Sequence, residues 1–395
     1  MSQHHYRTPL LPTPFHARTE AACRANEWSR WAGYKTVNCY THVELEYFAA
    51  RNQATLFDLS PMIKYRISGA DALPYLNRLM SRDVSKLEID RVAYTVWCND
   101  FGKVLDDGTL FRFDRNEYRL CVQDRHYPWL LDSAIGFDVA IDDVTDEIAA
   151  LALQGPTSYA ILRRLGFDEL GKLKPFSMGT VRYRGETLIV SRTGYSGDLG
   201  YELWAAPGLA ESLWDDLMAA GAEFGLIPMG SQALDMVRIE AGFPLPHVDF
   251  MPADHATRHT RGRSPLELGL GWLVDFDKDY FVGRRALLTE RETGGRYRLV
   301  GLDIDGNKPA NDALIYYARR KLVGHVTSAM WSPTCKRNIA LAELEAGRES
   351  LWKDLWVEIY VKKELKWEKM MARCRVVDRP FFRPARRRAT PPLDY

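Results

Sequence analysis

The sequence predicts an α+β protein that ends in a separate β-barrel. Amphipathic helical segments mix with strand-like segments over roughly the first 290 residues, as in "HVELEYFAARNQATLFDLS". After "FVGRRALLTERETG" strand-like runs dominate, namely "YRLVGLDID", "KLVGHVTSAMWS", "NIALAELE" and "LWVEIYV". No short-period repeat indicates a solenoid or propeller instead. We expect an irregular extension at 1–30, an α+β region of two interleaved subdomains at 31–290, a barrel at 291–380 and a basic Pro/Arg tail at 381–395.

Composition excludes several classes of protein. The chain has 395 residues, of which 46% are hydrophobic, and this is enough for two or three domains with real cores. Its 53 basic and 52 acidic residues leave a net charge of +1, so no overall field attracts nucleic acid or a membrane surface. No apolar run approaches membrane-spanning length, and the first residues lack a signal core. We expect a cytoplasmic protein with no nucleic acid and no membrane as partner.

The elements of the first half follow in a regular order. "ANEWSRWAGYKTVNCY" crowds aromatic residues, among them Trp31 and Tyr34, either as core or as the wall of an aromatic slot. An amphipathic helix follows, with Val43, Tyr47 and Phe48 at helical spacing, and it runs into a strand. "MIKYRISGADALPYLNRLMSRDVSKL" predicts a strand, a turn and a helix. The order predicts alternation of helices and strands.

A β-meander and two further helices complete the α+β region. "VAYTVWCNDFGKVLDDGTLFRFDRNEYRLCVQ" predicts three strands separated by two polar turns. "LAESLWDDLMAAGAEFG" and "SQALDMVRIEAG" predict helices that end at glycine. The Arg- and Pro-rich end, "RPFFRPARRRATPP", is expected to be a disordered or surface-wrapped segment in preference to a binding arm.

Two sets of acidic residues on predicted strands stand out. Asp106 and Asp107 begin a strand together, and because neighbours on a strand point to opposite faces, only one of them can face inward. Glu202 follows the glycine-rich "SRTGYSGDLG" and lies alone between Tyr201 and Leu203, which share the other face. Each could be an ordinary solvated residue. Two carboxylates on separate β-segments are also what a nitrogen-rich heterocycle needs as hydrogen-bond acceptors.

The segment "FPLPHVDFMPADHATRHTRGRSP" gathers histidines and acids. His247, Asp249, Asp254, His255 and His259 lie within thirteen residues. A metal site has to be considered, but the prolines and basic residues argue against a helix that would align the histidines, and the six cysteines contain no CxxC pair. We expect no metal and favour an acid or base near neutrality.

Seven motifs in order make the chain resemble the aminomethyltransferase family, which contains the glycine-cleavage T-protein and related folate-dependent demethylases. They are "RNQATLFDLSPM", "YTVWCNDFGKVLDD", "LALQGP", "RTGYSGDLGYEL", "VRIEAGFPL", "SPLELGLGW" and "YFVGRRAL". The resemblance implies a three-lobed ring with tetrahydrofolate in its central channel and glycines that let the backbone pass close to it. It implies these cofactor-binding residues: Glu202 on the pterin nitrogens, Asp106 near the nitrogen that accepts the one-carbon unit, and Arg238, Trp272, Tyr94 and Tyr195 in the same channel.

Departures from the T-protein pattern lie on the substrate side. Pro61 stands where the family usually has histidine, Lys103 replaces a usual glycine, and the connection that carries the histidines is longer. These features resemble the O-demethylase branch, which acts on aromatic methyl ethers such as vanillate, syringate or dicamba. Another folate-linked transfer, from dimethylsulfoniopropionate or an aminomethyl-lipoyl carrier, is the alternative, and a non-catalytic folate-binding protein is a third. No obligatory protein partner is inferred.

For the preferred reading we expect methyl transfer from a methoxylated aromatic acid to N5 of tetrahydrofolate. The phenolate leaves more readily when it is protonated, so an acid must help. His247 is the expected acid, Asp249 and His255 are reserves, and Asp106 orients N5. The expected substrate-binding residues are Trp31, Tyr34, Arg125, His126, His247 and His255.

Overall fold

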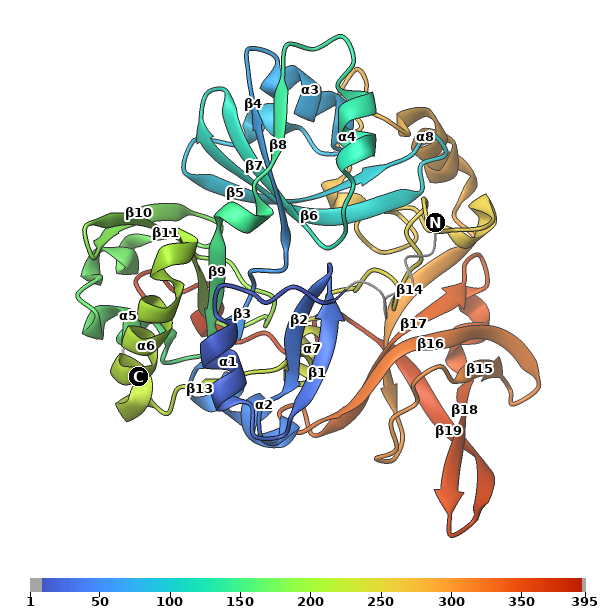
Figure 1. The fold of residues 1–395 in the computed structure, drawn as a ribbon. Helices are drawn as coiled ribbons and strands as arrows, with labels where there is room; N and C mark the ends of the chain where they lie inside the picture. Colours follow the sequence, from blue (N-terminus) through green and yellow to red (C-terminus); the bar gives the residue numbers. More distant parts are fainter. Residues whose placement is uncertain (1–8, 393–395) are drawn as a thin grey trace.

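Three lobes surround a common centre in this protein (Figure 1). A computed structural model describes residues 9–392. One lobe is built on a five-stranded sheet, the second on a six-stranded sheet, and the third is a closed six-stranded barrel. The predicted α+β fold, its three-lobed arrangement and its C-terminal barrel are therefore confirmed. Within residues 9–392, no helix is both long and apolar enough to cross a membrane.

The five-stranded lobe carries the two neighbouring aspartates. Its strand order is β5-β6-β7-β4-β8, and every pairing is antiparallel. Helices α3 and α4 cover one face, where Tyr75 and Leu130 join Tyr65 and Trp97 in one buried cluster. The elements are β4 (Ile63–Ser68), α3 (Ala72–Leu79), β5 (Arg91–Cys98), β6 (Val104–Asp114), β7 (Glu117–Val122), α4 (Tyr127–Ser133) and β8 (Ala140–Asp143).

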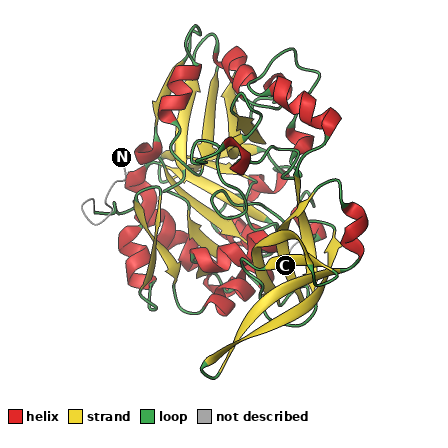
Figure 2. Ribbon diagram, turned by 90° about the vertical axis from the view of Figure 1, so that its right-hand side faces the viewer, coloured by secondary structure: helices red, strands yellow, loops and turns green. Residues whose placement is uncertain are grey.

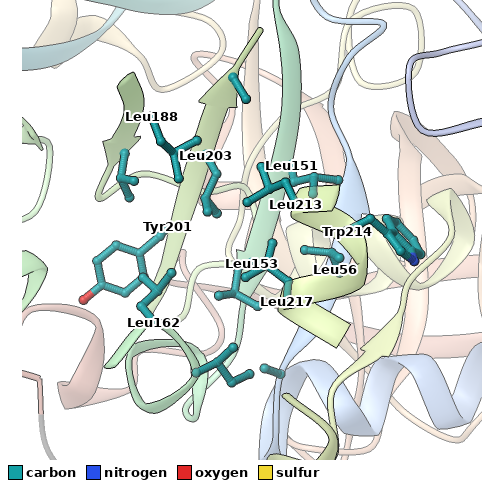
Figure 3. Packing of buried hydrophobic residues seen from close by; sticks show 14 of the residues in the cluster. Leu56, Leu151, Leu153, Leu162, Leu188, Tyr201, Leu203, Leu213, Trp214 and Leu217 are labelled. Atoms are coloured by element: carbon teal, nitrogen blue, oxygen red, sulfur yellow. The ribbon is translucent and has the colours of Figure 1, made fainter. Parts of the chain in front are cut away.

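The six-stranded lobe carries Glu202. Its strand order is β10-β11-β12-β9-β3-β13, so the chain enters this sheet at β3, builds the five-stranded lobe, and returns at β9. Figure 3 shows the covered face, on which Tyr201 and Leu203 pack with Leu151 and Leu213. The elements are β3 (Thr55–Asp58), β9 (Ala149–Gln154), α5 (Ser158–Arg164), β10 (Met178–Tyr183), β11 (Glu186–Ser191), β12 (Gly200–Ala205), α6 (Ala210–Gly221) and β13 (Ile227–Pro228).

The barrel follows helix α8 (Arg284–Thr293) and closes through the pairing of its first and last strands. Four strands match the predicted segments: β14 (Tyr297–Ile304), β16 (Lys321–Ser332), β17 (Arg337–Glu345) and β18 (Leu355–Lys363). The sequence prediction missed β15 (Leu314–Tyr317) and β19 (Lys366–Val377). The first is only four residues long, and the second begins with exposed charged residues that hide its pattern. The β18–β19 hairpin projects from the molecule (Figures 1 and 2).

The N-terminal region corrects one expectation. Residues 1–30 were expected to be irregular, but α1 (His16–Ala22) and β1 (Glu27–Trp31) lie within or across this range, and β1 pairs with β2 (Tyr34–Cys39). Phe15 is fully buried, with its ring 6.3 Å from that of Trp214, so burial orders a segment whose pattern looked random. Helices α2 (Val43–Asn52) and α7 (Ser231–Glu240) pack together behind this hairpin.

The basic tail wraps over the surface in its described part, residues 381–392. The Arg386 guanidinium donates to both carboxylate oxygens of Asp198, at 2.6 and 2.8 Å, and Arg192 donates to the carbonyl of Ala389 at 2.6 Å. Of the alternatives that the sequence left open, the surface-wrapped segment is the one observed.

The glycines of the Glu202 hairpin make room for protein atoms. A Cβ on Gly194 or Gly200 would lie 2.0 or 2.3 Å from the amide oxygen of Gln154, a buried side chain that also accepts a hydrogen bond from Ser196 at 2.7 Å. Gly197 has φ +73°, and a Cβ there would lie 2.5 Å from the Cβ of Ala241. The resemblance implied that these glycines admit a cofactor; the structure gives close protein packing as their reason.

Gly197→Ala is expected to lower the free energy of unfolding by about 2–4 kcal/mol, because left-handed φ and overpacking each carry a penalty. Gly185→Ala is the matched control, since Gly185 has φ +87° but no atom within 4 Å of an added Cβ. The free energy of unfolding of Gly185→Ala should fall only by the cost of the left-handed φ, about 1–2 kcal/mol. Urea unfolding of both variants measures the difference, and equal losses would show that the contact with Ala241 is not tight.

Candidate functional site

Asp107 and Tyr94 form the polar centre of one face of the five-stranded sheet. Asp107 lies opposite Val96 in the β5–β6 pairing, so it shares a face with Tyr94, two residues away on β5. The Tyr94 hydroxyl donates a hydrogen bond to the Asp107 carboxylate. Burial, together with the charge of neighbouring Asp106, raises the pKa of Asp107 to about 7. A carboxyl with this pKa can give or accept a proton near neutral pH.

Asp106, which the sequence favoured, faces the other way and is fully buried. Its carboxylate accepts hydrogen bonds from the backbone N–H groups of Asp107 (2.8 Å) and Asp124 (3.3 Å) and lies 3.0 Å from Nε2 of His126. These contacts make Asp106 an anchor for the segment that follows β7. Asp107, which the sequence named only as the other half of the pair, is the one beside Tyr94.

Tyr195 and Trp272 lie near this centre. The Tyr195 ring stacks on Phe243 at 5.4 Å, its hydroxyl donates to the carbonyl of Pro244 at 2.9 Å, and Asp107 is close enough to influence its pKa. Burial raises that pKa well above its usual range. Trp272 lies 6.2 Å from Tyr94 between ring centroids and is 69% exposed, so it has room to stack on a ligand.

Arg238 and Asp249 tie helix α7 to the barrel. The Arg238 guanidinium donates to Asp235, three residues earlier on the helix, at 2.7 Å, and also to Asp249 and to Ser328, the latter at 2.8 Å. Asp249 in turn accepts from Ser328 at 2.7 Å and from the N–H of Leu245 at 2.9 Å. Both side chains are almost fully buried, so the contacts indicate a structural role for Asp249 and not the reserve acid expected from sequence.

Glu202 lies on the face of its sheet opposite Tyr201 and Leu203, as strand alternation predicted. Its carboxylate accepts a hydrogen bond from the Thr193 hydroxyl at 2.5 Å. Burial raises the pKa of Glu202 to about 7, against the smaller opposing effect of its hydroxyl partners. Among residues 9–392, neither Glu202 nor Asp107 has a cationic side chain within ion-pair distance.

The faces of Glu202 and Asp107 are packed against each other. Trp204 shares the face of Glu202 and Phe111 that of Asp107, and their rings meet edge to face with centroids 5.3 Å apart. Cys121 lies on the same face of the five-stranded sheet as Asp107. Burial raises the pKa of its thiol, and the charge of Glu202 raises it further. Glu202 and Asp107 therefore lie on the two sheet faces that meet at this contact.

A second group of titratable residues surrounds His126. Its Nε2 lies 3.0 Å from Asp106, its Nδ1 lies 3.5 Å from Asp254, and its ring meets Trp97 edge to face at 5.6 Å. Burial alone would lower the pKa of His126, but the two carboxylates outweigh it and raise the pKa to about 9. His126, expected to contact substrate, is a buried cation between two acids.

His247 and His255 approach the same region from the long loop. Nε2 of His247 contacts the carboxylate of Asp124, which lowers the pKa of that acid and raises the pKa of His247. The rings of His247 and His255 meet edge to face at 4.8 Å, and both residues are exposed. The structure thus brings together three of the predicted residues, His126, His247 and His255, with Asp124 as a partner that the sequence did not indicate.

The side chains of Trp31, Tyr34 and Arg125 make other contacts, and Trp31 packs on the cluster that contains Phe111 and Trp204. The Tyr34 hydroxyl donates to Asp146, and Tyr34 lines a cavity of about 310 Å³. Arg125 forms an ion pair with Asp143. Burial raises the pKa of Tyr34, and the positive charge of Arg125 opposes this rise. Trp31 packs on Phe57 with centroids 6.2 Å apart. Of these three expected substrate-binding residues, Tyr34 alone is among the described residues that line the cavity.

The Asp107–Glu202 region fits the donor pattern of tetrahydrofolate. Its pterin presents ring N–H and amino groups, and buried Glu202 and half-buried Asp107, neither of them paired with a described cationic side chain, are acceptors for such donors. Tyr94, Tyr195 and Trp272 add the aromatic surfaces on which flat rings stack.

Comparison with known proteins shows the family to which the chain belongs. A family model described as the GCVT N-terminal domain matches residues 15–278, and one described as the glycine cleavage T-protein C-terminal barrel domain matches residues 298–383. An aminomethyltransferase of Caldanaerobacter subterraneus is 37% identical over 321 residues, which cover 80% of this chain and 83% of the relative. One from Bacillus pumilus is 35% identical over 387 residues, 96% of this chain and 99% of the relative.

A solved structure shows the same fold over nearly the full length. The glycine cleavage system aminomethyltransferase T from Bartonella henselae superimposes with a TM-score of 0.81 at 24% identity, covering 95% of this chain and 98% of that one. Fold and relatives together define a folate-dependent one-carbon transferase, whose cofactor is tetrahydrofolate as expected from the sequence. The chain belongs to the glycine-cleavage T-protein family of aminomethyltransferases.

Proposed function

We propose that this chain moves a one-carbon unit onto N5 of tetrahydrofolate held between the faces of β6 and β12. Glu202 binds the N–H groups of the pterin, and Asp107 lies beside N5 in place of Asp106. The observation that carries the proposal is a pair of carboxyls, buried Glu202 and half-buried Asp107, on sheet faces that meet through Trp204 and Phe111, with pKa values raised to about 7 and no cationic partner among the described side chains. Tetrahydrofolate supplies the nucleophilic nitrogen, and the proton that N5 loses passes to Asp107.

The first candidate donor is an aminomethyl group on a lipoyl thioether. Two aminomethyltransferases at 37% and 35% identity, the second matched over 96% of this chain, favour it. In the balanced reaction the carbon leaves sulfur and nitrogen for the folate, so that methylene-tetrahydrofolate, ammonia and the dithiol form. Tyr94 holds the Asp107 carboxylate in place while it receives the proton.

The second candidate donor is a methoxylated aromatic acid, which the sequence favoured. The observation that supports it is the polar cluster that His247 and His255 of the long loop form with Asp124 and His126. This cluster is separate from the Asp107–Glu202 pair. In this reaction the methyl carbon passes to N5, the carbon–oxygen bond breaks, and His247 donates the proton that turns the phenolate into a phenol. The products are 5-methyltetrahydrofolate and a phenol.

The donor is identified by one anaerobic incubation of the purified chain with tetrahydrofolate and separate methyl or aminomethyl donors. An aminomethylated lipoyl carrier, methoxybenzoates and dimethylsulfoniopropionate are supplied in turn, and the folate product is read by mass. Methylene-tetrahydrofolate from the carrier alone supports aminomethyl transfer. Methyl-tetrahydrofolate from a methoxybenzoate alone supports O-demethylation. Folate binding without any product would replace both with a non-catalytic folate-binding protein.

A further inference from the structure

We propose that Asp124, His247 and His255 form a binding site for a divalent transition metal such as Zn²⁺. One ligand atom from each residue lies within 4.8 Å of the other two. The sequence argued against a metal here because His255 and His259 could not be aligned on a helix. The structure brings together a different set of ligand residues. The carboxylate of Asp124 comes from the segment after β7, and the two histidines come from the long loop.

The backbone around each ligand is tied down. The N–H of Asp124 donates to buried Asp106 at 3.3 Å. The N–H groups of His247 and His255 donate to the carbonyls of Phe250 (2.8 Å) and Pro252 (3.1 Å). His247 has φ +66°, a left-handed conformation that is uncommon for residues other than glycine. These backbone contacts fix the positions from which the three side chains extend.

The ligand set decides which cations fit. Two imidazoles and one carboxylate suit Zn²⁺, Co²⁺ or Fe²⁺, whereas Mg²⁺ and Ca²⁺ prefer oxygen ligands alone. The side chains of Asp124 and His247 are 29% and 36% exposed, so water can complete the coordination. Asp106 and Asp254 add negative charge nearby, and His126 is the described basic side chain that pairs with both of them. The local charge balance favours a cation.

The test of this site does not depend on folate chemistry. The site does share His247 with the second candidate reaction. A metal on Nε2 of His247 excludes a proton there, so the loaded protein would lack that proton donor. Binding of the metal itself is therefore the readout. Its failure leaves the folate proposal intact, and failure of the folate proposal leaves the metal site intact.

The test is calorimetric titration of the full, untagged, chelator-treated chain with Zn²⁺, repeated with Co²⁺ while the visible absorption is recorded. One Zn²⁺ per chain and intense visible Co²⁺ bands, which indicate a four-coordinate site, are expected. His255→Gln and Asp124→Asn should each weaken Zn²⁺ binding about 100-fold and abolish the bands, with unchanged circular dichroism.

Two controls separate this site from incidental histidines. His325→Gln removes an exposed histidine of β16 that contacts only Glu343 among the acids described, and it should bind Zn²⁺ as the parent does. A double variant, His4→Gln with His5→Gln, removes two adjacent histidines outside the described residues and should also leave the stoichiometry unchanged. Unaltered binding in His255→Gln and Asp124→Asn, or loss in the double variant, would overturn the proposal.

Discussion

Glu202→Gln is expected to make the folate-free protein more stable at pH 8 and to weaken tetrahydrofolate binding. The folded pKa of Glu202 is about 7, above its ordinary value of 4.5. Below pH 4.5 the carboxyl is protonated in both states and burial carries no charge penalty. Between pH 4.5 and 7 only the folded state keeps the proton, so stability falls as the pH rises. Above pH 7 the full penalty, of the order of 3 kcal/mol, is present.

The glutamine variant cannot ionise, so it should lose much of this slope in urea unfolding between pH 5 and 8. Asp107 should keep a slope of the same sign and similar size in the variant, because its pKa is also raised to about 7. Glu186→Gln, at the exposed start of β11 in the same sheet, is the control and should retain the parent slope. An unchanged slope in Glu202→Gln would show that Glu202 is not buried as a carboxylate.

The same substitution tests the pterin contact. A hydrogen bond to a charged acceptor contributes about 1.5–3 kcal/mol, so tetrahydrofolate affinity should fall roughly 10- to 100-fold in Glu202→Gln. Fluorescence titration under anaerobic conditions measures it, again against Glu186→Gln. If Glu202→Gln gains stability but binds tetrahydrofolate with unchanged affinity, the pterin does not bind at Glu202.

Asp107→Asn and Asp106→Asn are expected to fail in opposite ways. Asp107 is the carboxyl beside Tyr94, and its loss removes the proton acceptor, so turnover should fall about 10²- to 10⁴-fold while folding persists. Asp106 is buried against His126, and its loss leaves that cation without one of its two acids. Breaking such a buried pair costs about 3–5 kcal/mol, which should lower the melting temperature markedly.

Measuring thermal unfolding and single-turnover rate on both variants separates the two aspartates. The pair serves as its own control, because each substitution is the same change at adjacent residues of one strand. A stable but inactive Asp106→Asn beside an active Asp107→Asn would return the reaction to the residue that the sequence favoured.

Some features follow from the sequence alone. Local periodicity predicted the α+β region and four strands of the barrel, and strand alternation placed Glu202 opposite Tyr201 and Leu203. These are short-range properties, set by side chains a few residues apart. The motif order was enough to predict tetrahydrofolate, because it extends along most of the chain.

Tertiary structure decided the rest of the candidate site. The two-residue period of a strand predicts that Asp106 and Asp107 face opposite ways. Which of these two faces is covered by α3 and α4 depends on how the sheet packs. In the structure the helices cover the face of Asp106. Asp124 and His247 are 123 residues apart, and only the folded loop brings them into contact. The hairpin glycines, likewise, are explained by Gln154 and Ala241, neighbours in space that no local pattern reveals. Local sequence determines which faces exist, whereas long-range packing determines what each face meets.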